Sequence, residues 1–127
     1  MKNDASERYR TTEHGVVKIN NNAITTIASV AAMEVRGVYR IGGGISKTLH
    51  ELFMGKNGAK GVKVHVTENE MKLTVYITVE YGVGIPRIAD EVQENVKTAV
   101  EKMTGLVLAG VDVVVEGVRS PQAAAGK

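Results

Sequence analysis

The strongest constraint on the fold is the succession of a strand, a helix and a second strand between residues 71 and 118. Over residues 71–81 an apolar side chain recurs at every second position, which is typical of a strand with one buried and one exposed face. Gly82 and Gly84 then release the extended backbone, and Pro86 has the fixed backbone angle of a first helical turn. The pattern therefore predicts a strand that leads directly into a helix.

The predicted helix covers residues 85–103 and is amphipathic. Its apolar side chains recur every three or four positions and form one stripe: Ile85, Ile88, Ala89, Val92, Val96, Ala99, Val100 and Met103. Lys102 complements the helix dipole at the end, and Gly105 can take the left-handed conformation that closes a last turn. Residues 106–118 return to a two-residue period with valines on one side, which predicts the second strand.

Earlier parts of the chain add further elements. Residues 14–19 predict a short strand, and a second amphipathic helix follows with the stripe Ile24, Ile27, Ala28, Ala31 and Val35. Residues 38–41 predict a brief extended segment, and residues 62–66 form a hairpin with the strand that begins at Met71. Between residues 42 and 61, helical spacing of apolar residues competes with several glycines, and we expect a short helix and then a basic loop.

These elements predict an α+β fold. The expected architecture is a two-layer sandwich with a β-α-β-β-α-β-like order, in which two amphipathic helices cover one face of a mainly antiparallel sheet. Residues 1–12 are interpreted as a loose lead-in, residues 13–118 as a single domain and residues 119–127 as a disordered tail. At 127 residues the chain is long enough to bury a core of its own.

The composition argues against several classes of function. The chain has no cysteine, which excludes disulfides and thiolate chemistry and suits a reducing cytoplasm. The N-terminal residues lack the apolar core of a signal peptide, and no apolar window approaches the roughly 18 residues of a membrane span. We therefore expect a cytoplasmic protein with no direct insertion into a membrane.

The candidate catalytic residues do not form a recognisable pattern. His14, His50 and His65 lack a second ligand at helical spacing, so surface histidines are favoured over a metal site. No serine lies in a nucleophile elbow, and the pair Asp90 and Glu94 is interpreted as surface charge on the exposed side of the helix. The sequence predicts no enzymatic activity, no cofactor and no metal.

Charge is unevenly distributed although the net charge is only +2. Residues 36–63 contain six basic residues and one acidic residue, whereas residues 64–116 contain nine acidic and four basic residues. Ordinary solvated faces explain such a bias, but it also suits self-association or an acidic partner, and we predict partner contacts at Lys47, Lys56, Lys60 and Lys63. The alternative is an RNA-binding loop at residues 55–61, where Gly-Lys-Asn-Gly matches the Gly-x-x-Gly pattern of KH modules.

Several short motifs occur in the order found in one bacterial family. They are Tyr81-Gly82, Ile85-Pro86, Val92-Gln93, the run from Val100 to Leu106, the closing Val111-Asp112-Val113 to Val118, and the block from Gly15 to Gly37. In these motifs the chain resembles the alkaline shock protein family, also called the envelope stress response family, over most of residues 12–118. The resemblance implies a non-enzymatic cytoplasmic protein of Gram-positive type that forms homo-oligomers. It also implies that a separate anchor protein can hold the protein at the membrane periphery.

Overall fold

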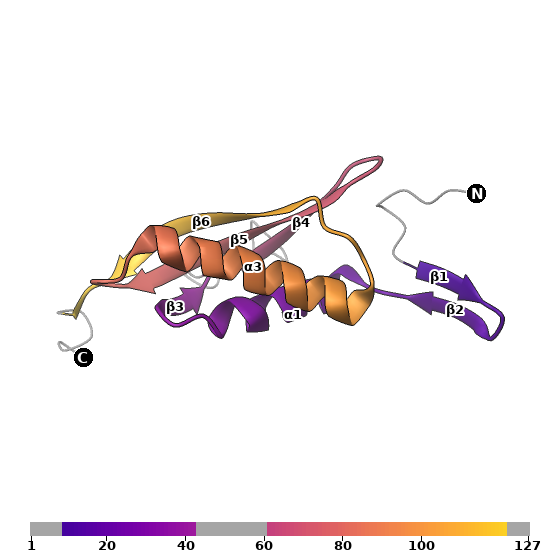
Figure 1. The fold of residues 1–127 in the computed structure, drawn as a ribbon, viewed down its shortest axis with the longest axis horizontal. Helices are drawn as coiled ribbons and strands as arrows, with labels where there is room; N and C mark the ends of the chain where they lie inside the picture. The colour runs from indigo at the N-terminus through magenta and orange to yellow at the C-terminus, as the bar shows by residue number, and fades with distance from the viewer. Residues whose placement is uncertain (1–8, 43–60, 122–127) are drawn as a thin grey trace, which may run out of the picture.

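The computed structural model describes residues 9–42 and 61–121, and it confirms the expected α+β fold. Two helices lie on one side of a four-stranded sheet, and a separate two-stranded hairpin precedes them (Figure 1). The elements are β1 (Tyr9–Thr12), β2 (Gly15–Lys18), α1 (Asn21–Met33), β3 (Val38–Ile41), β4 (Val62–Val66), β5 (Met71–Glu80), α3 (Ile85–Thr104) and β6 (Gly110–Arg119).

Strand β5 is the centre of the main sheet. Its first half pairs antiparallel with β4 and its second half pairs antiparallel with β3, so these two short strands share one edge. The other edge pairs with β6 in parallel along nearly the whole strand, because α3 returns the chain to the start of the sheet. The prediction of an antiparallel sheet thus holds for β3 and β4, while the β5–α3–β6 unit adds a long parallel pair.

The strands β3 and β4 meet beside Tyr76. The Gly42 backbone N–H donates to the Tyr76 carbonyl at 2.7 Å, and the Tyr76 N–H donates to the Gly61 carbonyl at 2.9 Å. Gly61 has a φ of +78°, and a Cβ there would lie 2.5 Å from the Gly42 nitrogen. The chain therefore leaves the sheet after β3 and re-enters it before β4 at nearly the same point.

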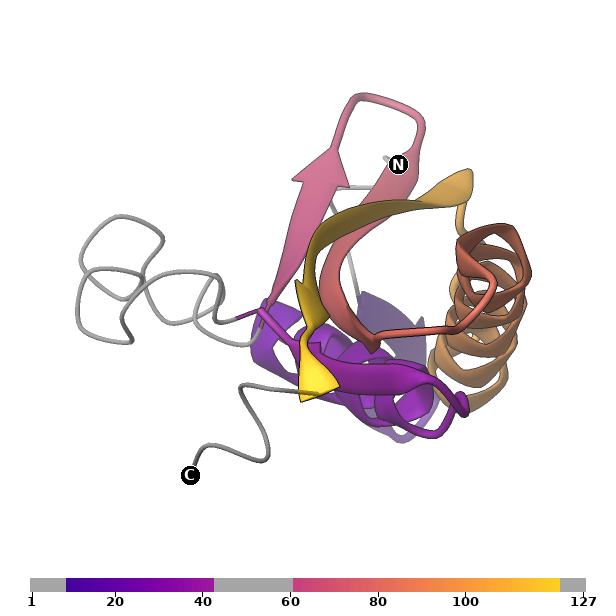
Figure 2. The same cartoon turned by 90° about the vertical axis from the view of Figure 1, so that its left-hand side faces the viewer.

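The core lies between the sheet and the two helices, which are on the same side of the sheet in both views (Figures 1 and 2). Alanines on α1 allow this helix to approach β3, β4 and β5 closely. Helix α3 buries Ile88, Val92, Val96 and Val100 completely. It ends at Gly105, which has a left-handed φ of 78° and donates its N–H to the Glu101 carbonyl, as expected.

The N-terminal region differs from its prediction. Residues Tyr9–Thr12, assigned to a loose lead-in, form strand β1, and the strand expected at residues 14–19 is β2 of the same hairpin rather than part of the main sheet. Both edges of β5 are already occupied, whereas β2 finds a partner across a two-residue turn. In this turn the His14 N–H donates to Thr12 Oγ1 at 3.0 Å. The outer boundaries of the single domain, 13 and 118, stay predictions.

Candidate interaction surfaces

The predicted contact lysines are only partly within the described residues. Lys63 lies on β4, beside fully buried Val62 and opposite Thr74 on β5. Because side chains alternate along a strand, Lys63 faces away from the helices. We call this side of the sheet the open face. The other three predicted contacts, Lys47, Lys56 and Lys60, lie outside the described residues, as does His50.

Two cations on the open face have no acidic partner among the described residues. Arg40 on β3 is exposed and lies opposite Thr78, and Lys63 is half-buried. By contrast, Arg119 lies 3.7 Å from a Glu80 carboxylate oxygen, and its guanidinium carbon lies 4.3 Å from the centre of the Tyr39 ring. The open face therefore combines neutralised pairs with two cations that a partner can contact.

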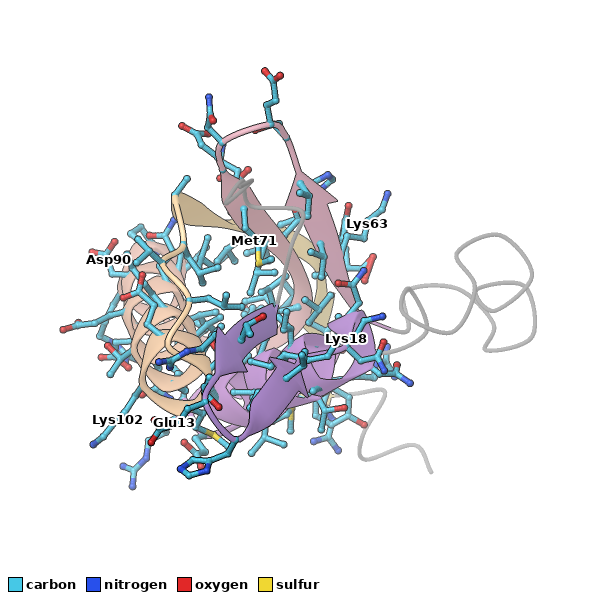
Figure 3. All side chains as sticks on the ribbon, turned by 90° about the vertical axis from the view of Figure 1, so that its right-hand side faces the viewer. Glu13, Lys18, Lys63, Met71, Asp90 and Lys102 are labelled. Atoms are coloured by element: carbon cyan, nitrogen blue, oxygen red, sulfur yellow. The ribbon has the colours of Figure 1, made fainter. Side chains whose placement is uncertain are left out.

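Exposed acidic side chains also lie on helix α3, on the other side of the molecule from Lys63. Helix α3 presents Asp90 to solvent, and Figure 3 shows Asp90 and Lys63 on opposite sides of the protein with Met71 between them. Ion pairs on this helix neutralise part of the charge: Arg87–Glu91 at 3.0 Å and Lys97–Glu101 at 2.8 Å. Helix α3 therefore carries four acidic and three basic residues, so its acidic excess is small.

Glu101 connects α3 to the segment that follows it. Its carboxylate accepts a hydrogen bond from Lys97 Nζ and another, at 2.8 Å, from the Leu108 backbone N–H. The Lys97 hydrogen bond, followed by that from Leu108, lowers the pKa of Glu101 below its usual value. Glu101 therefore fixes the path of the chain into β6 and serves a structural purpose.

The remaining titratable residues do not assemble a reactive cluster in the described ranges. His14 is exposed beside Glu13, with 3.6 Å between Nε2 and Oε2, and His65 Nε2 lies 3.0 Å from Thr74 Oγ1. Asp90 and Glu94 line an open hollow on the α3 surface. Within residues 9–42 and 61–121, no group of three histidine, aspartate or glutamate residues is placed to hold a metal ion.

An apolar groove between α1 and α3 was not predicted from the sequence. It has a volume of about 280 Å³ and is lined by Thr26, Ile27, Val30, Ala31, Glu34, Ala99 and Met103. Val30 is 55% exposed and Met103 is 71% exposed. The predicted stripe of α3 is thus buried in its middle, while Ile85 and Met103 at its two ends are exposed. The sequence feature that could have indicated the groove is Val30, an apolar residue outside the predicted stripe of its helix.

The described residues form a two-layer α+β domain, and its candidate functional sites are charged and apolar surfaces. Residues 9–120 match the alkaline shock protein 23 family, which is described as having a cell envelope-related function, and the chain belongs to this family. It is 34% identical to the uncharacterized protein YqhY of Bacillus subtilis, over 87% of this chain and 82% of the relative. It is 32% identical to YloU of the same organism, over 85% of this chain and 92% of the relative.

Among solved structures, a variant of the MamM CTD is similar with a TM-score of 0.46 and 17% identity, over 78% of this chain and 95% of that chain. Neither helix in the described part of the chain has the length and apolar character needed to cross a membrane.

Proposed function

We propose that this chain is a non-enzymatic interaction protein that self-associates and docks on a membrane-anchor or envelope-related partner in the cytoplasm. The observation that carries the proposal is the presence of two cations on the open face without an acidic partner among the described residues. Arg40 and Lys63 lack acidic partners among the described residues on the open face, while the acidic residues of α3 lie on the opposite side. The family's cell envelope-related description agrees with such a partner.

The attachment points of the segment that carries three of the predicted contacts lie on the main sheet. Residues 43–60 join the sheet at Gly42 and Gly61, and both ends lie beside Tyr76 in the row where β3 meets β4. Arg40 and Lys63 are each two residues from these ends. In the sequence, Lys47, Lys56 and Lys60 lie between these two cations, so we include all five in the proposed contact.

A protein partner fits these surfaces better than lipid does. Anionic headgroups attract clusters of basic residues of uniform charge. The described open face also carries two carboxylates, Glu80 and Asp112, which are paired with Arg119 and Lys72 at 3.7 Å each. Mixed charge of this kind favours a partner of defined pattern over a uniformly negative membrane surface.

The test distinguishes binding to a membrane protein from binding to lipid. Purified chain is sedimented with membrane vesicles of Bacillus subtilis, with the same vesicles after protease treatment, and with protein-free vesicles made from their lipids. We expect binding only to untreated vesicles. The variant with Lys47, Lys56, Lys60 and Lys63 all changed to glutamate should lose it, while Lys102→Glu, at an exposed position on α3, should retain it.

Equal binding to protein-free vesicles, or unchanged binding by the four-lysine variant, would overturn the proposed docking. Self-association is measured separately, as molar mass by light scattering over a range of protein concentration and ionic strength. A salt-independent monomer would contradict the self-association part of the proposal.

The RNA-binding alternative rests on residues 55–61, of which the structure describes only Gly61. It stays a prediction, and fluorescence anisotropy with single-stranded RNA at low and high salt tests it. Affinity that falls steeply with salt would support the alternative, because phosphate contacts release counterions, and no binding at low salt would end it.

A further inference from the structure

We propose that the β1–β2 hairpin of one copy docks in the α1–α3 groove of a second copy, with Val17 entering the groove beside Val30. This inference rests on the proposed self-association and names the surfaces that carry it. The groove is the one lined by Ile27, Val30 and Met103, and the two copies exchange hairpins reciprocally.

The hairpin is an exposed arm. All four residues of β2 are exposed, and Val16 and Val17 have exposed fractions of 63% and 52%. Figure 1 shows β1 and β2 beyond the end of the helices, at the opposite end of the molecule from the turn between β5 and α3. An isolated two-stranded hairpin is only marginally stable in water, so this arm gains order by lying against another surface.

The groove is an exposed apolar surface of suitable size. Val30 and Met103 line it from α1 and α3, and Ala31 and Ala99 form a floor of small side chains. Its 280 Å³ is enough space for a branched aliphatic side chain and its neighbours. Methionine adapts its shape to an incoming group, so Met103 can close over an inserted valine.

The arm cannot reach the groove of its own chain. Only Ile19 and Asn20 separate β2 from α1, and Ile19 packs against the core. The hairpin continues outward along the long axis of the molecule rather than folding back over the helices (Figure 1). A surface on another copy is therefore required.

The distances match a two-fold arrangement. Val17 precedes Asn21 by four residues, at most about 13 Å of extended chain. Val30 follows Asn21 by nine helical residues, about 14 Å along the helix axis. A two-fold axis near Asn21 therefore places Val17 of each copy alongside Val30 of the other, and the same contact occurs twice.

Charge is complementary at the same contact. Arg10 is the cross-strand neighbour of Val17, so both side chains leave the hairpin on the same face. The groove ends at Glu34, which also lines the adjoining hollow with Glu91, Glu94 and Arg36. Glu91 is paired with Arg87, so Glu34 and Glu94 give this hollow its acidic excess. When Val17 enters the groove, Arg10 lies within reach of these carboxylates.

Cysteine cross-linking of the full chain tests this contact directly, because the chain has no cysteine of its own. Val17→Cys protein is mixed with Val30→Cys protein that carries a larger tag, and disulfides form under mild oxidation. The matched control replaces the second partner with Val118→Cys, since Val118 is 47% exposed on β6. We expect the Val17–Val30 product to exceed the control by on the order of tenfold, because docking raises the local cysteine concentration.

A second measurement uses light scattering on Val30→Glu and Val118→Glu. We expect Val30→Glu to lose self-association and Val118→Glu to retain it. If the wild type self-associates but the cross-link does not exceed its control, or Val30→Glu assembles normally, the hairpin exchange is wrong and the proposed self-association stands. If the wild type is a monomer at every concentration, the hairpin exchange and the proposed self-association are both wrong.

Discussion

Gly61→Ala tests the junction at which β3 and β4 meet on the edge of β5. Gly61 has a φ of +78°, where a residue with a Cβ is strained by about 1 kcal/mol. The new Cβ would also lie 2.5 Å from the Gly42 nitrogen and 2.6 Å from Ile41 Cγ2. Because the first of these is backbone in a sheet, relief requires the strand ends to separate, at a further cost of about 2 kcal/mol.

The expected loss is therefore about 3 kcal/mol of unfolding free energy, from a total of about 5–15 kcal/mol for a domain of this kind. Urea denaturation followed by circular dichroism measures it. With a slope of roughly 1.5 kcal/mol per molar urea, the midpoint should fall by roughly 2 M.

Gly82→Ala is the matched control for Gly61→Ala. Gly82 has a φ of +96°, but a Cβ there meets no atom within 4 Å. Gly82→Ala should therefore lower the unfolding free energy only by the strain of the left-handed backbone, about 1 kcal/mol. If Gly61→Ala destabilises the protein no more than Gly82→Ala does, the close contact between the two strand ends is refuted.

Two further predictions concern hydrogen bonds of α3. The pKa of Glu101 is lowered in the folded state, so its stabilisation is complete above the usual glutamate pKa of about 4.3 and is lost as pH falls through the lowered value. In urea denaturation at a series of pH values, the midpoint of Glu101→Gln should fall less than that of the wild type as the pH is lowered through this range. An equal fall in both proteins would contradict the lowered pKa of Glu101. Asn95 Nδ2 donates to the Ala31 carbonyl at 2.7 Å and connects α3 to α1. Asn95→Ala should cost about 1 kcal/mol by urea denaturation, and an unchanged midpoint would refute this connection.

Periodic patterns in the sequence predicted most of the main domain. The alternation over residues 71–81 predicted β5, and the three- and four-residue spacing with its closing Gly105 predicted α3. These patterns are local consequences of burying one face of an element, so they can be read without a structure. The uneven distribution of charge along the chain was also visible, because Lys63 and Asp90 belong to stretches of opposite charge.

The partner of each strand could not be predicted in the same way. Residues 15–18 have the composition of a strand, but the sequence does not say whether they pair with β5 or with residues 9–12. Pairing depends on which sheet edges other strands occupy, and that is a property of the whole fold. The groove was missed for a related reason, because helical spacing does not reveal that Met103 lines an open groove against α1 and stays exposed.

The shared edge of β5 makes the protein a natural host for an inserted domain. Gly42 and Gly61 are held side by side through Tyr76, so a guest whose own ends are adjacent could replace residues 43–60 without pulling β3 from β4. The entropy of closing such a loop rises only slowly with its length. The same geometry lets the length and sequence of this stretch change while the strands on either side keep their places on β5.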